Sequence, residues 1–267
     1  MAEQQIIPAD QVLTNKLFII PLSGRPIFPG IFTPLMIADK EDMEVVNQAL
    51  ASNGLIGLVM MKEAETENPG AADLNRVGTV AKIVKRINLP DGGLNIFIST
   101  LKRFEIKKFI ASEQPISAAV DYLDDTNDDS DEVRALSRAL LTEMKQLSEN
   151  NPIFSEEVRL NMVNIDHPGK IADFISSILN VKREEQQMIL ETADIQRRME
   201  QVLVFIKKEQ ELLSIQKKIQ EQINEKIEKS QREYFLKEEL KAIKKELGMP
   251  VDAKSGEYQR FKEAIDQ

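Results

Sequence analysis

The sequence contains no cysteine and no tryptophan, and it has one histidine among 267 residues. Without cysteine, disulfides, thiol catalysis and thiolate metal sites are excluded. The longest apolar runs, such as LFIIPL and LIGLVMM, are too short to cross a bilayer. The first residues have neither the basic segment nor the apolar core of a secretory signal peptide. These absences predict a soluble, cytoplasmic protein without a membrane partner.

Positive charge is also scarce relative to negative charge, because the formal net charge is −9 and the isoelectric point is about 5.0. Non-specific nucleic-acid binding needs a basic surface that displaces counterions, so the acidic balance argues against a nucleic-acid partner. Hydrophobic residues make up 42% of the chain, which is enough for a core, and charged residues 30%. The length fits two domains, and the charged fraction indicates long, solvated helices.

The first part of the chain, residues 1–123, has the pattern of β-strands. KLFIIPL and LIGLVMMK are short apolar runs, and PISAAVDYL is a third. Two further runs flank Pro90–Gly93, whose glycines supply the positive φ that a tight hairpin needs. A short helix is expected to begin at Asp39 and to end at Gly54. The pattern predicts a small β-rich domain, a partly closed barrel with one or two helices.

An acidic block, DDTNDDSDE at residues 124–132, interrupts the strand pattern. A block of like charges without apolar residues is usually a solvated linker. After it the periodicity is helical, in DEVRALSRALLTEMKQLSENN, SEEVRLNMVNI and HPGKIADFISSILN. Residues 133–191 are therefore expected to form a helical subdomain, which gives the chain an α+β fold class.

Residues 192–248 contain no proline, and their single glycine is the last residue. One uninterrupted helix of this length would measure roughly 85 Å. A narrow apolar stripe on so polar a helix predicts coiled-coil-like contact with a partner helix, although the spacing does not establish a regular supercoil. Residues 249–267 begin another amphipathic helix without a C-terminal cap, which suggests a fragment of a longer protein. The stripe consists of Leu212, Ile215, Ile219, Ile223 and Ile227.

The histidine, His167, precedes Pro168 at the head of an expected helix. A general base needs an orienting partner, and no catalytic constellation surrounds this residue in the sequence. A role in a loop or helix cap is therefore expected. The sequence also lacks G-x-S-x-G and H-E-x-x-H patterns and any serine with an evident partner base. These observations predict a chain without an active site.

Asp125, Asn127 and Asp129 have the first spacings of a calcium-binding loop. The loop also requires a glycine where this chain has Ser130, and a glutamate where it has Leu136. No phosphate-binding glycine loop is present, and the prolines of PLSGRPIFPG remove backbone donors that would cradle a phosphate. We therefore expect neither a metal site nor a cofactor site in this chain.

Apolar residues stand among prolines and glycines in GRPIFPGIFTPLMI. Ile27, Phe28, Ile31 and Phe32 could fill the barrel after the first strand. Alternatively, some of them could remain on the surface and hold exposed apolar segments of other proteins. For this second interpretation the candidate substrate contacts are Phe28, Pro29 and Ile31.

Several stretches of the sequence resemble those of a known protein family. QREYFLKEELKAIKKELG, preceded by KIQEQINEKIEKSQ, resembles the signature at the end of the N-terminal region of Lon, a family of ATP-dependent bacterial serine proteases of the AAA+ class. LFIIPLSGRPIFPGIFTPLMI resembles the start of that region, and HPGKIADFISSIL occupies the position of the family's equivalent helix. The resemblance covers essentially the whole chain, in order.

The resemblance implies a PUA-like β-rich domain, a helical subdomain and a long extended helix. It implies a region that recognises unfolded, damaged or short-lived regulatory proteins and helps to build a homohexamer. In the family, an ATPase module that uses ATP and Mg²⁺ and a protease domain with a Ser/Lys dyad follow. None of their motifs occurs here, so this chain is expected to be non-catalytic. For assembly, the expected packing residues are the stripe together with Tyr234, Phe235 and Leu240.

Two alternatives remain open at this point. The chain could be a stand-alone adaptor, in which a PUA-like domain and a helical arm bind partners without a protease. RNA binding is a third interpretation, based on fold analogy alone. The acidic charge and the absence of tryptophan give that interpretation little support.

Overall fold

A computed structural model describes residues 13–66, 68–90, 93–149, 165 and 167–249. The chain divides into two compact units, Met1–Gln210 and Glu211–Gln267. The helix expected for SEEVRLNMVNI, apart from Ile165, and the helix expected after Pro250 lie outside the described residues.

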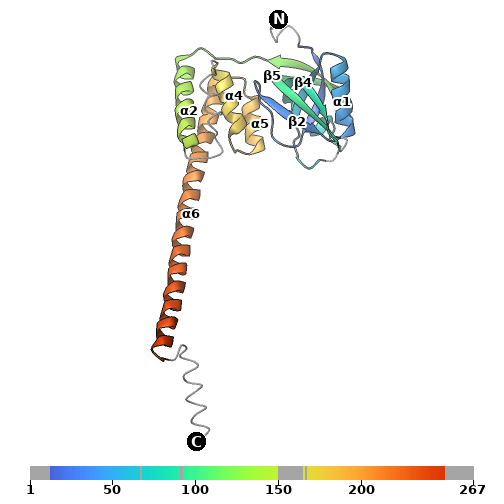
Figure 1. Cartoon of the computed structure of the whole chain (residues 1–267). Helices are drawn as coiled ribbons and strands as arrows, with labels where there is room; N and C mark the ends of the chain where they lie inside the picture. Colours follow the sequence, from blue (N-terminus) through green and yellow to red (C-terminus); the bar gives the residue numbers. More distant parts are fainter. Residues whose placement is uncertain (1–12, 67, 91–92, 150–164, 166, 250–267) are drawn as a thin grey trace, which may run out of the picture. The chain divides into compact units, whose positions relative to one another are not determined.

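The order of elements is β-rich first and helical second, as an α+β fold requires (Figure 1). The strands are β1 (Lys16–Leu22), β2 (Phe32–Ile37), β3 (Leu55–Met60), β4 (Val77–Asn88), β5 (Leu94–Ala111) and β6 (Ser117–Leu123). The helices are α1 (Lys40–Ala51), the short 3₁₀ helix η2 (Ala71–Asp73), α2 (Asp131–Glu149), α4 (Pro168–Ile178), α5 (Arg183–Glu191) and α6 (Ile195–Glu246). The α+β class predicted from the sequence is confirmed.

The strands form a barrel because β5 is long enough to bond to three neighbours. The sheet order is β2-β5-β4-β3-β1-β6, and β6 pairs again with β5. The first half of β5 pairs with β2, for example Ser99 with Phe32, and the second half pairs with β6, for example Arg103 with Leu123. Bulges in the β4–β5 ladder accompany this change of partner, since a bulge bends and twists a strand. The strands β5, β4, β3, β1 and β6 thus close a ring, to which β2 adds an outer edge.

The barrel interior is built around Phe104, which is completely buried. Its ring lies against two glycines on neighbouring strands. A Cβ atom at Gly57 would lie 2.9 Å from Phe104 Cζ, and one at Gly78 would lie 2.9 Å from the same atom and 2.4 Å from the carbonyl oxygen of Leu58. Real Cβ atoms do not approach so closely, so the absence of side chains at these positions makes room for the ring.

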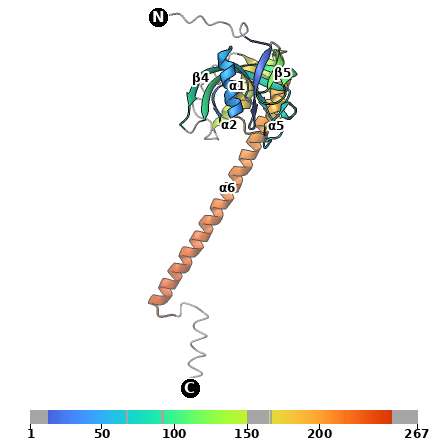
Figure 2. The ribbon, with the colours of Figure 1, turned by 90° about the vertical axis from the view of Figure 1, so that its right-hand side faces the viewer.

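Helix α1 lies against the barrel (Figures 1 and 2). It covers a second apolar cluster there. Val45, Val46 and Ala49 are buried in that cluster together with residues of β1, β3, β4 and β5. The helix follows Asp39 as its N-cap residue, and it ends before Gly54, whose φ is +71° and whose N–H donates to the carbonyl of Ala49 at 2.7 Å. The predicted beginning and end of this helix are confirmed.

Buried charges join the helices of the first unit to the barrel. Arg103 of β5 donates to Asp173 Oδ2 on α4 at 2.8 Å and to the carbonyl of Leu190 on α5 at 2.9 Å. Arg198 of α6 donates to Asp173 Oδ1 at 3.0 Å and to Asp125 Oδ1 at 2.5 Å. Because Arg103, Asp173 and Arg198 are buried, each charge needs these partners.

The acidic block at 124–132 supplies Asp125 to this network. Backbone hydrogen bonds also join the block to the residues around the start of α6. The Thr126 N–H donates to the carbonyl of Ala193 at 3.1 Å, and the Ile195 N–H donates to the carbonyl of Thr126 at 3.0 Å. Helix α2 begins within the block, at Asp131. Most side chains of this segment are exposed, but Asp125 and the Thr126 peptide group are bound by residues far along the chain, so the linker is fixed at these two points.

The second unit contains the continuation of α6 beyond Gln210. The helix runs without interruption from Ile195 to Glu246, so the predicted long helix is confirmed. Lysines lie in its last turn, where they complement the helix dipole. Gly248 follows with φ +68°, and the Met249 N–H donates to the carbonyl of Lys244 at 2.8 Å, which caps the helix. None of the described helices combines the length and the hydropathy needed to cross a membrane.

Candidate functional site

The outside of the barrel carries an apolar face where β2, β5 and β4 lie side by side. The strand register places Pro34 of β2 and Lys85 of β4 on either side of Phe97, and Met36 and Ile87 on either side of Asn95. Residues directly opposite each other in a sheet share a face. We call the apolar members of this surface the outer apolar face: Phe32, Pro34, Met36, Ile87 and Phe97.

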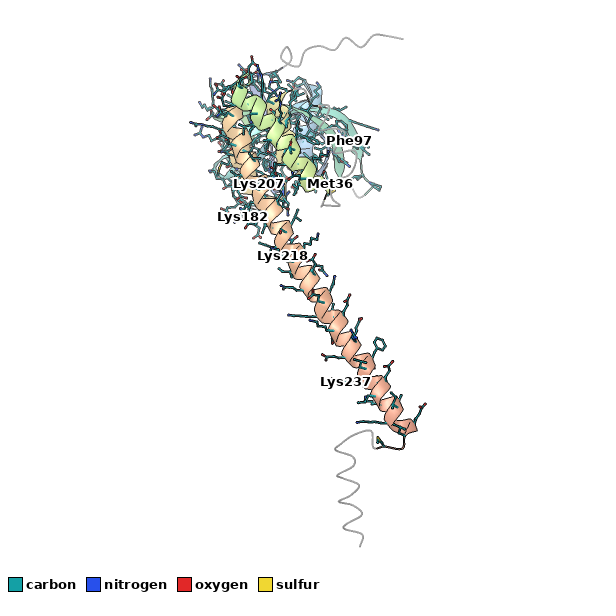
Figure 3. The ribbon with its side chains drawn as sticks, turned by 90° about the vertical axis from the view of Figure 1, so that its left-hand side faces the viewer. Met36, Phe97, Lys182, Lys207, Lys218 and Lys237 are labelled. Carbon is teal, nitrogen blue, oxygen red and sulfur yellow. The ribbon has the colours of Figure 1, made fainter. Side chains whose placement is uncertain are left out.

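Two of these side chains are far more exposed than apolar residues usually are. Phe32 has 62% of its surface exposed and Met36 71%. The ring of Phe32 stacks on that of Phe97, with centroids 6.1 Å apart and an angle of 25° between the planes. Figure 3 labels Met36 and Phe97. A rigid aromatic pair beside a flexible thioether is well suited to bind varied apolar partners.

The sequence of β2 explains why this face is apolar. Thr33, Leu35 and Ile37 point inward, where Ile37 and Leu35 join the cluster under α1. A half-buried strand normally alternates apolar and polar residues, but here the outward positions are Phe32, Pro34 and Met36. Proline is tolerated because β2 is an edge strand, which has one side without a ladder. The run FTPLMI, apolar on both faces, is the signal that could have identified this surface.

The three substrate contacts predicted from the sequence differ in how far they are buried. Phe28 is completely buried, and its carbonyl accepts a hydrogen bond from the Thr100 hydroxyl at 2.7 Å, so the prediction that it contacts substrate is wrong. Pro29 and Ile31 are half-buried, and the Ile31 N–H donates to Thr100 Oγ1 at 2.8 Å. The same segment exposes Phe32 instead, because the chain enters the edge strand there.

The stripe on α6 forms a second apolar surface, within the second unit. Its exposed fractions, with those of the aromatic residues that follow, lie between 44% for Ile223 and 64% for Phe235. Tyr234 and Phe235 meet edge to face, with ring centroids 6.0 Å apart. In Figure 3, the labelled Lys218 and Lys237 project from the same helix. The packing role of these residues stays a prediction; they are Leu212, Ile215, Ile219, Ile223, Ile227, Tyr234, Phe235 and Leu240.

His167 is the N-cap residue of α4. Its Nδ1 atom accepts a hydrogen bond from the Gly169 N–H at 3.1 Å, and Pro168 occupies the first helical position. The expected role as a cap is confirmed. Its Nε2 atom lies 3.7 Å from Asp128 Oδ2, a residue of the acidic block.

The three residues with calcium-loop spacing have other partners in the structure. Asp125 binds Arg198, Asn127 donates to Asp194, and Asp129 accepts from Arg134. In the described part of the chain, no group of three or more acidic, histidine or cysteine side chains is placed to hold a metal ion.

A closed barrel that presents an exposed apolar face and is bonded to a helical subdomain defines an α+β domain. The family model described as "ATP-dependent protease La (LON) substrate-binding domain" matches residues 16–208. That match covers more than half of the chain, which therefore belongs to the Lon substrate-binding domain family.

Curated relatives agree with this assignment. The chain is 57% identical to the Lon protease of Treponema pallidum (strain Nichols) over 262 residues, which are 98% of this chain and 30% of that protein. It is 42% identical to the Lon protease of Leptospira interrogans, with coverage of 98% and 31%. The chain thus spans about a third of the length of these relatives.

Solved structures confirm the fold. A Lon N-terminal domain protein from Xanthomonas campestris superimposes with a TM-score of 0.52, and the N-terminal domain of a Mycobacterium avium complex Lon protease with 0.58. Each is 16% identical, and each match covers 72% of this chain and 98% of the other.

Proposed function

We propose that this chain holds polypeptide substrates for a cytoplasmic ATP-dependent Lon protease, and that the outer apolar face contacts them. The exposure of Phe32 and Met36 on a rigid barrel is the observation that carries this proposal. Unfolded and damaged proteins expose apolar segments that native proteins bury. Covering the exposed apolar surface would favour binding by about 25 cal/mol per Å² removed from water.

This chain supplies binding and no chemistry in the proposal. Its described residues show an apolar surface, and the titratable side chains of its buried network are committed to one another. Peptide-bond hydrolysis by a Ser/Lys dyad, and the use of ATP and Mg²⁺, are assigned to modules outside these 267 residues. The binding of a substrate here would raise its local concentration near those modules.

The test compares a double variant within the outer apolar face with a single control variant outside it. Phe32→Ser combined with Met36→Ser removes the exposed side chains of β2, whereas Ile110→Ser removes an apolar side chain of β5 that is 53% exposed. Binding of reduced, fluorescently labelled casein is measured by anisotropy. We expect the double variant to bind about tenfold more weakly, as loss of an aromatic contact predicts, and Ile110→Ser to bind like the unchanged chain.

Circular dichroism checks that the variants are folded, which is expected because the replaced side chains are exposed. Unchanged casein binding by a folded double variant would contradict the proposed role of the outer apolar face. Equal losses in both variants would show that any exposed apolar residue contributes, so that the face is not a specific site.

A second part of the proposal concerns assembly: the stripe on α6 pairs with the same stripe of another copy. Its spacing and exposure support this role, because water-exposed isoleucines at helical spacing gain free energy when a partner helix covers them. Light scattering over a concentration series would compare Ile219→Glu with Ile223→Glu against Ser214→Glu with Asn224→Glu, which adds the same charge outside the stripe. We expect association to disappear in the first double variant alone, and a monomeric unchanged chain would contradict the proposal.

A further inference from the structure

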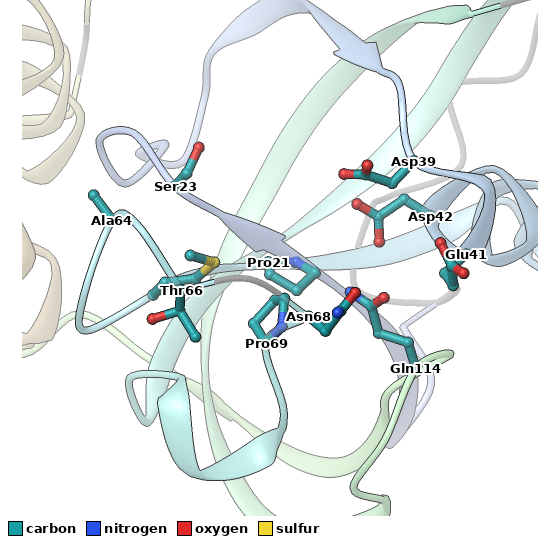
Figure 4. A pocket seen from close by; sticks show the side chains of 11 residues that line it. Pro21, Ser23, Asp39, Glu41, Asp42, Ala64, Thr66, Asn68, Pro69 and Gln114 are labelled. Atoms are coloured by element: carbon teal, nitrogen blue, oxygen red, sulfur yellow. The ribbon is translucent and has the colours of Figure 1, made fainter.

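A cavity of about 370 Å³ opens beside the beginning of α1 (Figure 4). Its volume falls in the range of sites that bind small molecules or side chains. Carboxylates dominate one side of it, where Asp39, Glu41 and Asp42 are grouped. The other walls come from the end of β1, the loop before η2 and the loop before β6.

Asp42 lacks the partner that a buried carboxylate requires. Only 9% of its surface is exposed, and its Oδ1 atom has no hydrogen-bond partner among the described residues. Burial and the neighbouring charges of Asp39 and Glu41 raise the pKa of Asp42 to about 6. A buried carboxylate with an unpaired oxygen is costly, so positive charge in the adjoining cavity would stabilise its charged form.

The chemistry of the lining indicates what that group is. No lysine, arginine or histidine is among the described residues that line the cavity, so the carboxylates have no counterion from the wall itself. The described acidic side chains also do not converge closely enough to hold a metal ion. Pro21, Met61 and Pro69 add apolar side chains to a lining that is otherwise mainly polar. Anionic groups beside apolar walls match a basic side chain, whose charged head and aliphatic stem need both.

We propose that this cavity binds a lysine or arginine side chain of a polypeptide substrate. The inference rests on the proposed function and adds to it a chemical preference. Strand β2 carries Phe32 and Met36 of the outer apolar face and ends at Ile37, two residues before Asp39. One strand therefore connects the apolar surface to the acidic cavity. A substrate with a basic residue close to an apolar segment engages both, which favours it over a substrate with neutral flanks.

The experiment uses labelled, unstructured peptides that share one apolar segment and differ only in their flanking residues, which are lysine or glutamine. Anisotropy at low salt measures their binding to the whole chain, to Asp42→Asn and to Glu105→Gln. Asn has the shape of Asp without its charge, and Glu105 is an exposed acid of β5 that does not line the cavity. We expect the unchanged chain to prefer lysine flanks about tenfold, the contribution of one charge-assisted hydrogen bond.

Asp42→Asn should reduce this preference to less than about twofold without changing the binding of the glutamine-flanked peptide, and Glu105→Gln should keep it, since a distant exposed charge is screened. A preference that persists in Asp42→Asn, or that is absent from the unchanged chain, overturns the inference. Failure of the glutamine-flanked peptide to bind at all contradicts the proposed function of the outer apolar face. If the lysine-flanked peptide then still binds through Asp42, the cavity stands without that face.

Discussion

Arg198 donates a 3.0 Å hydrogen bond to Asp173, and both side chains are almost completely buried. The pair connects α6 to α4, and Arg103 connects the same carboxylate to the barrel. The helical subdomain is thus attached to the β-rich domain by charges as well as by apolar packing. The network stabilises this arrangement of the elements, because breaking one pair leaves a buried charge without its partner.

Replacing Arg198 with methionine should lower the free energy of unfolding by about 3 kcal/mol, because it leaves Asp173 and Asp125 with one cation fewer. Urea denaturation followed by circular dichroism measures the change. Arg197→Met is the control, since the neighbouring arginine is exposed and its loss should cost less than about 0.5 kcal/mol. Equal stability of the two variants would show that the network contributes little.

Replacing Gly78 with alanine should lower the free energy of unfolding by about 2 kcal/mol or more, because the new Cβ would lie 2.4 Å from the carbonyl oxygen of Leu58. Backbone atoms cannot move aside as the end of a flexible side chain can. Gly24→Ala is the matched control, because no atom lies within 4 Å of its added Cβ. A denaturation midpoint for Gly78→Ala equal to that of Gly24→Ala would contradict the packing around Phe104.

Phe28 and Phe32 stand four residues apart but should respond very differently to replacement by alanine. We expect Phe28→Ala to cost about 3–5 kcal/mol, since it empties a fully buried position. Phe32→Ala should cost less than about 1 kcal/mol, because 62% of that side chain is exposed. Chemical denaturation measures the free energy of unfolding of both variants, and similar costs would contradict the difference in burial between the two side chains.

The sequence could predict elements whose signals are local. The glycines before β5 and the alternation on both sides indicated the β4–β5 hairpin, and Asp39 and Gly54 marked the ends of α1. Local signals could not show that Phe28 is buried and Phe32 is exposed. Prolines and glycines interrupt the segment between them, so no period of two or of 3.6 residues assigns either side chain to a face.

Contacts between residues far apart in the sequence could not be predicted either. Asp125 is 73 residues from Arg198, and the acidic block around it has the composition of a solvated linker. A sequence pattern shows that negative charges are adjacent, but not that an arginine from another element will meet one of them. Closure of the barrel depends in the same way on bulges in β5, which composition does not reveal.

The pH dependence of the free energy of unfolding should show the raised pKa of Asp42. Its pKa is raised from 3.8 to about 6 in the folded chain, so between these values the folded state binds more protons than the unfolded state. Stability must then fall as pH rises through this interval, and above it the charged carboxylate should cost about 2–3 kcal/mol. Asp42→Asn removes the cost, so the variant should be more stable than the unchanged chain at pH 7 and similar to it near pH 4. Urea titrations across this range measure the difference, with Glu44→Gln, an exposed position of the same helix, as the control. A difference that does not vary with pH would mean that Asp42 ionises normally, and that its carboxylate is not the unpaired group that the cavity requires.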